Sequence, residues 1–112
     1  MKKENEKSYV WKFKGERLIL KGREIWYLHT EQRKLFVHTR RHVYQIGGSL
    51  KEAAEKLCGL RMMRPHNAYL VQLDYLETIN AHQAVLKNGV TLPVSAHGWK
   101  RARNLLEQNS EK

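Results

Sequence analysis

The stretch EIWYLHTEQRKLFVHTRRHVYQI, residues 24–46, decides the fold class because it reads as consecutive β-strands. Aromatic and β-branched residues, which are enriched in strands, fill the segments 24–30, 35–39 and 42–46. Polar turns at residues 31–34 and 40–41 separate these segments, and Gly47-Gly48 ends the last one. The stretch therefore predicts consecutive strands, the first of which is buried on both faces because its apolar residues are continuous.

Further strands are predicted on both sides of this stretch. Upstream, residues 9–13 and 17–20 flank a turn at Lys14-Gly15-Glu16. Downstream, strand-forming segments occupy residues 68–73, 76–81, 83–86 and 90–94, and the Asn88-Gly89 step favours a hairpin between the last two. Residues 61–67 are predicted to be irregular, because Pro65 lacks an N–H donor and disfavours helix in Arg64.

Two short helices are predicted among the strands. Ser49 and Glu52 form a capping box for a helix that ends near Cys58, where Gly59 can take the left-handed conformation. Ser95 is the expected N-cap of a terminal helix that reaches Glu107. The sequence is therefore that of a mainly β protein with helices at two places.

The chain of 112 residues is long enough for one domain, which we place at residues 9–107 between flexible segments at 1–8 and 108–112. Lys and Arg number 21 against 11 Asp and Glu, a formal net charge of +10 that favours a polyanionic partner. The basic residues form several small groups, as expected of basic loops on a folded body. The N-terminus has no signal-peptide pattern and no run is apolar enough to span a membrane, so a cytoplasmic location is expected.

Catalytic, metal-binding and cofactor functions are not predicted. The six histidines show no metal-ligand spacing, and Cys58 is the single cysteine. Asp74 is the single aspartate, and Gly47-Gly48 lacks the Gly-Lys-Ser/Thr of a phosphate-binding loop. We therefore expect no enzyme activity, no catalytic residue, no metal and no cofactor.

Aromatic residues at strand positions are expected mostly in the core. They are Trp11, Trp26, Phe36, Tyr44 and Tyr69. The alternative is a stacking platform for single-stranded nucleic acid, for which Trp11-Lys12-Phe13-Lys14 is the one local indication.

The region from Ser49 to Lys100 resembles the LytTR family, the DNA-binding output domain of many bacterial response regulators. The resemblance rests on SLKEAAEKL at 49–57, MMRPHNAYLVQ at 62–72, LETI at 76–79 and GVTLPVS at 89–95, followed by Lys100. With the upstream strands it spans roughly residues 9–107. It implies an elongated antiparallel β-sheet assembly of about ten short strands with one or two short helices, and loops that enter successive major grooves.

Site residues follow from the same resemblance. It implies base contacts from Arg33, Lys34, Asn67 and His97. Asn can read adenine N6/N7 and Arg can read guanine O6/N7. Phosphate contacts are then expected from Arg61, Arg64, His66, Lys100 and Arg101. Ala96-His97 stands where the family has two basic residues.

These observations predict a sequence-specific double-stranded DNA-binding transcriptional regulator. Direct-repeat sites are the expected target, with a homodimer on DNA and an inhibitor or sensor protein partner left open, and no small-molecule substrate is expected. One alternative is a protein-interaction module controlled by an inhibitor partner. The other is a single-stranded nucleic-acid or RNA-binding module.

Overall fold

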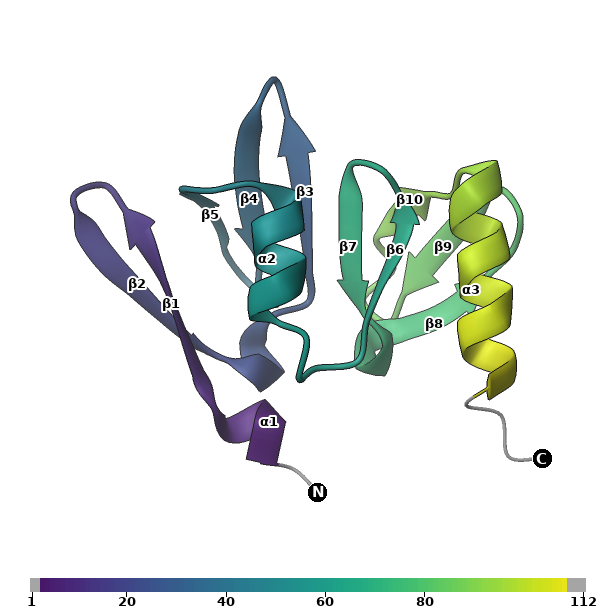
Figure 1. Cartoon of the computed structure of the whole chain (residues 1–112), viewed down its shortest axis with the longest axis horizontal. Coiled ribbons are helices and arrows are strands. Elements are labelled where there is room, and N and C mark those ends of the chain that lie inside the picture. The colour runs from purple at the N-terminus through teal and green to yellow at the C-terminus, as the bar shows by residue number, and fades with distance from the viewer. Residues whose placement is uncertain (1–2, 109–112) are drawn as a thin grey trace.

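A computed structural model describes residues 3–108 as an elongated assembly of three antiparallel sheets with extents of 44 × 35 × 24 Å (Figure 1). The helices are α1 (Lys3–Glu6), α2 (Leu50–Lys56) and α3 (Ala96–Gln108), and short 3₁₀ turns are η1 (Gly22–Glu24) and η2 (Leu73–Tyr75). The strands are β1 (Ser8–Phe13), β2 (Glu16–Lys21), β3 (Tyr27–Glu31), β4 (Lys34–His38), β5 (Val43–Ile46), β6 (Met62–His66), β7 (Tyr69–Gln72), β8 (Leu76–Ile79), β9 (Gln83–Leu86) and β10 (Thr91–Pro93). The mainly β prediction is confirmed.

The central sheet has five strands in the order β5-β4-β3-β7-β6. Its inward residues, among them Leu28, Val37 and Leu70, pack in one cluster with Leu50 and Leu57 of α2. Side chains alternate across a strand, so these residues share the face that α2 covers. The β1–β2 hairpin adds Tyr9, Trp11 and Leu20 to the same cluster.

A second core joins the central sheet to the C-terminal part of the chain. Trp26, Met63 and Val71 pack there with residues of the β8–β10 sheet and with Ala102 of α3. The buried Gln72 side chain links the two parts, since its amide Nε2 donates to the Gly22 and Ile25 carbonyl oxygens at 3.1 and 2.6 Å. Both hydrogen bonds fix η1 against the end of β7.

The strand predictions are confirmed except around Pro65, where the prediction of an irregular stretch is wrong. Residues 62–66 form β6, paired with β7 through a register shift between Met63 and His66. A proline is tolerated there because a bulge does not require its missing N–H. The Pro65 side chain is fully buried, so packing outweighs the local signal.

Smaller differences concern the end of α2, the start of β3 and the termini. The predicted left-handed cap at Gly59 is wrong, because α2 ends at Lys56 with Leu57 as its C-cap, and Gly59 has no positive φ. The predicted strand at 24–30 begins at Tyr27, because η1 occupies residues 22–24. Its predicted burial on both faces is wrong, since Leu28 is buried on the α2 side whereas Tyr27 and His29 on the other face are only partly buried. Lys3–Glu6 of the predicted flexible segment form α1, and residues 1–2 and 109–112 lie outside the described residues. Within residues 3–108 no helix is long and apolar enough to cross a membrane.

The aromatic residues divide between full and partial burial. Trp11 and Trp26 are core residues, as predicted, whereas Phe36, Tyr44 and Tyr69 are only half-buried. Lys56 Nζ lies 4.9 Å from the centre of the Trp11 ring, and Phe13 packs edge-on against Tyr44. The Trp11–Lys14 segment therefore does not expose the aromatic surface that a single-strand stacking platform requires.

Replacement of Gly98 by alanine should loosen α3 from β6. A Cβ at residue 98 would lie 1.7 Å from the Pro65 carbonyl oxygen, a backbone atom that cannot rotate away. We expect Gly98→Ala to lower the free energy of unfolding by at least about 2 kcal/mol in urea titration. The control is Asn104→Ala on the exposed side of α3, which should change it by less than about 0.5 kcal/mol. Equal stabilities of the two variants would contradict this packing.

Candidate nucleic-acid interface

The predicted base-contacting segments lie at one edge of the molecule. β3 and β7 are antiparallel neighbours, with Leu28 opposite Leu70 and His29 opposite Tyr69. The Thr30 N–H donates to the Ala68 carbonyl at 3.0 Å, so the end of β3 lies beside the start of β7. The β3–β4 turn and the β6–β7 turn therefore project from the same edge, the upper edge in Figure 1, which we call the loop edge.

The β3–β4 turn has an unusual backbone. Gln32 and Arg33 have φ values of 52° and 66°, the left-handed conformation that a type I′ hairpin turn requires at both central positions. Neither residue is glycine, so each costs roughly 1–2 kcal/mol of strain. The turn holds the exposed Arg33 side chain at its tip, and Lys34 follows as the first residue of β4, opposite Glu31.

Hydrogen bonds at Ser95 attach the start of α3 to the same edge. The Ser95 N–H donates to the Pro65 carbonyl at 2.9 Å, which ties the helix to β6 just before its turn. Ser95 caps the N-terminus of α3, as predicted, since its Oγ accepts a hydrogen bond from the Gly98 N–H at 3.0 Å. Ala96 and His97, both exposed, therefore lie close to the β6–β7 turn that carries Asn67. The helix also directs its positive dipole end towards the loop edge.

Three of the predicted phosphate contacts have internal partners that shape the β6–β7 turn. Arg64 Nη2 donates to the Asn67 carbonyl at 2.8 Å, and Arg101 Nη2 donates to the Arg64 carbonyl at 3.1 Å. His66 Nδ1 accepts from the Ala68 N–H at 3.1 Å. These bonds leave the Asn67 side chain exposed on a fixed backbone.

Lys100 and Arg61 differ from that group and from each other. Lys100 is exposed near the start of α3, on the side of the molecule where the loop edge lies. Arg61 precedes β6, at the end of that strand away from its turn, and its Nη1 donates to Asp74 Oδ1 at 3.0 Å. The structure thus brings Arg33, Lys34, Asn67, His97 and Lys100 to one edge and separates Arg61 from them.

A histidine pair on the uncovered face of the central sheet was not predicted. His29 Nδ1 lies 2.8 Å from His38 Nε2, and His29 Nε2 lies 3.3 Å from the Glu31 carboxylate. The carboxylate accepts a hydrogen bond, so Nε2 of His29 carries its proton and Nδ1 accepts from His38. Burial, and secondarily the electrostatic interaction with His29, lowers the pKa of His38 to about 4. Only the strand register brings the two rings together, so their sequence spacing gave no signal.

Basic turns projecting from one edge of an elongated antiparallel β scaffold define a DNA-binding domain. The family model of the LytTr DNA-binding domain matches residues 15–107, and the chain belongs to this family. Among solved structures, the chain is similar to the LytTr DNA-binding domain of a methyl-accepting/DNA response regulator from Bacillus cereus. The TM-score is 0.75 at 21% identity, over 88% of this chain and 95% of that one. A search of curated protein sequences found no match.

The stability of the protein should depend on pH through His38. Its pKa of about 4 lies below the value of about 6.5 in an unfolded chain, so the unfolded state binds more protons in that interval. The contribution of neutral His38 to the free energy of unfolding is present above pH 6.5 and is lost as the pH falls towards 4. Because the ring is partly exposed, we expect a difference of roughly 1 kcal/mol.

Chemical denaturation of wild type and His38→Gln between pH 7.5 and 4.5 measures this contribution. Gln can donate to His29 but does not titrate, so the free energy of unfolding of the variant should fall less steeply with decreasing pH. If the free energy of unfolding varied with pH in the same way for the two proteins, His38 would not be the source of the pH dependence.

Proposed function

We propose that this domain is a sequence-specific double-stranded DNA-binding transcriptional regulator that inserts the turns of the loop edge into successive major grooves. The observation that carries the proposal is the pair of hydrogen bonds from Thr30 to Ala68 and from Ser95 to Pro65. They bring together three exposed segments that are far apart in the sequence. The net charge of +10 supports the same partner.

The three segments are suited to different tasks. Arg33, at the tip of a strained turn, presents a guanidinium that can form two hydrogen bonds with guanine O6 and N7. Asn67 presents an amide that can form two with adenine N6 and N7, from a backbone that Arg64 holds in place. His97 offers a single ring donor or acceptor, so its contribution to base discrimination is the weakest of the three.

Phosphate contacts are proposed around these segments. β4 and α3, which carry the exposed Lys34 and Lys100, lie on either side of the β6–β7 turn (Figure 1). The N-terminus of α3 adds backbone N–H groups that favour anions. Arg101, Arg64 and His66 can add a second hydrogen bond to a phosphate while they keep the bonds that shape the turn. We propose no phosphate contact for Arg61, because its ion pair with Asp74 lies at the end of β6 away from the loop edge. On direct repeats, two copies would bind side by side.

Selection of duplexes from a random pool, followed by titration of the enriched site at increasing salt, tests the proposal. With about five phosphate contacts, the logarithm of affinity should fall with the logarithm of salt concentration at a slope of about −4 to −5. A single strand of equal length should bind more weakly. A slope near zero, or preference for the single strand, would contradict duplex binding.

Substitutions should distinguish sequence-specific base contacts from the non-specific attraction of the basic domain to DNA. We expect Arg33→Ala and Asn67→Ala each to weaken binding to the selected duplex by about 1–3 kcal/mol, with a smaller effect on a random duplex. Arg61→Ala removes the same charge as Arg33→Ala but at the far end, so it should leave both affinities nearly unchanged. Equal losses in Arg33→Ala and Arg61→Ala would contradict the assignment of the loop edge.

A further inference from the structure

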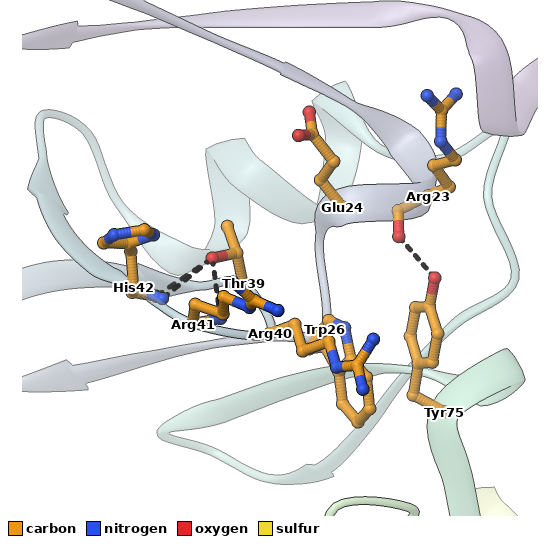
Figure 2. Close-up of a pocket in the computed structure, with 8 residues that line it drawn as sticks. All are labelled: Arg23, Glu24, Trp26, Thr39, Arg40, Arg41, His42 and Tyr75. Atoms are coloured by element: carbon orange, nitrogen blue, oxygen red, sulfur yellow. Dashed lines mark hydrogen bonds between the residues drawn. The ribbon is translucent and has the colours of Figure 1, made fainter.

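A pocket of about 390 Å³ opens at the end of the central sheet opposite the loop edge. It is formed by the β4–β5 connection (residues 39–42), by Arg23 and Glu24 of η1, and by Trp26 and Tyr75 (Figure 2). β4 runs away from the loop edge and spans its five residues, roughly 17 Å, before the connection begins. A duplex held by the loop edge therefore does not account for this pocket.

The β4–β5 connection is a rigid support for two arginines. Thr39 Oγ1 accepts hydrogen bonds from the His42 N–H at 3.0 Å and the Arg41 N–H at 3.4 Å, and the Thr39 N–H donates to the His42 carbonyl at 2.9 Å. Arg40 and Arg41 are exposed on this turn, and neither guanidinium has a hydrogen bond or ion pair within residues 3–108. Two uncompensated guanidiniums thus stand at the pocket on a backbone that needs no rearrangement.

An aromatic pair forms another part of the pocket wall. The rings of Trp26 and Tyr75 stack with their centres 4.2 Å apart and their planes within 9°. The Tyr75 hydroxyl donates to the Arg23 carbonyl, and Trp26 is buried in the second core, so neither ring is free to turn away. Figure 2 shows this pair together with Arg40 among the residues that line the pocket. The pocket therefore combines a fixed aromatic part with the cationic side chains of Arg40 and Arg41.

The acidic groups nearby do not neutralise the arginines. Glu24 is the single acidic residue that lines the pocket, and its carboxylate accepts from the Lys21 N–H at 2.7 Å. Glu6 pairs with Arg23 at 2.7 Å and lies outside the pocket lining. His42 adds two ring nitrogens to the lining. The pocket keeps an excess of positive charge.

We propose that this pocket binds a small ligand that carries both a phosphate group and a planar ring, that is, a ligand of the nucleotide class. Adjacent guanidiniums match phosphate oxygens bidentately, and the partly exposed Tyr75, fixed against the buried Trp26, favours a flat ring. Free phosphate would use the arginines alone, and a neutral aromatic compound would use the wall alone. The volume lies within the range of small-molecule sites. The site is independent of DNA binding, since it shares no residue with the loop edge.

Calorimetry of the full chain with ADP, adenosine and pyrophosphate tests the ligand class. We expect ADP to bind at least tenfold more tightly than either fragment, and its addition should shift the backbone amide resonances of residues 39–42. Pyrophosphate as tight as ADP would overturn ring recognition. A poly-glutamate peptide that binds more tightly than ADP and competes with it would overturn the nucleotide class in favour of an acidic peptide.

Two double variants remove the same charge from opposite ends of β4. Arg40→Ala/Arg41→Ala should weaken ADP binding at least tenfold and change duplex affinity less than threefold at 0.15 M salt, where charges this distant are screened. Arg33→Ala/Lys34→Ala should do the reverse. Equal loss of ADP binding in both variants would show that net charge alone attracts ADP, and equal loss of duplex binding would place the pocket within the DNA interface. Either result overturns the proposal.

Each proposal can fail while the other stands. If ADP binds wild type and Arg33→Ala/Lys34→Ala but no duplex is bound, the pocket stands and the DNA-binding proposal falls. If duplex binding depends on Arg33 and Lys34 but ADP does not bind, the pocket assignment falls alone.

Discussion

The arrangement of the molecule depends on the contact between the Pro65 carbonyl and the turn at Ser95. The Ser95 N–H donates to this carbonyl, and Gly98 allows the helix backbone to approach it more closely than any side chain would permit. This contact brings the start of α3 to the β6–β7 turn. The hydrogen bond from Arg101 to the Arg64 carbonyl and the packing of Ala102 in one cluster with Met63 hold the rest of the helix against β6. Together these contacts place Asn67 and His97 on one surface, the loop edge.

Most of the fold could be predicted from the sequence because its signals are local. The turn at Lys14-Gly15, the Ser49–Glu52 capping box and the Asn88-Gly89 hairpin each depend on a few neighbouring residues, and each is present in the structure. β6 was missed because Pro65 argues locally against a strand. Its placement is decided by burial and by the bond from Ser95, thirty residues away, which no local pattern contains.

The residues of the candidate site could be named from the sequence, but the groups that each of them contacts could not. Arg61 and Arg64 look alike in the sequence, yet Arg61 precedes β6 and pairs with Asp74, whereas Arg64 lies within β6 and donates to the Asn67 carbonyl. Arg101 supports the turn from a different element, since it donates to the Arg64 carbonyl. Such differences arise from strand direction and from contacts across the fold, so the basic residues can be assigned separate tasks only once the register is known.

The two ends of β4 show why net charge alone does not define a partner. Arg33-Lys34 and Arg40-Arg41 are equivalent basic pairs, and both add to a field that attracts any polyanion. What differs is the neighbouring surface: the first pair stands on an open turn, whereas the second adjoins the stacked Trp26 and Tyr75. A projecting turn can enter a groove wider than itself, whereas a shallow pocket beside an aromatic pair suits a small ligand. A charge of +10 therefore need not serve one polyanion, because the surface next to each basic pair selects what that pair can bind.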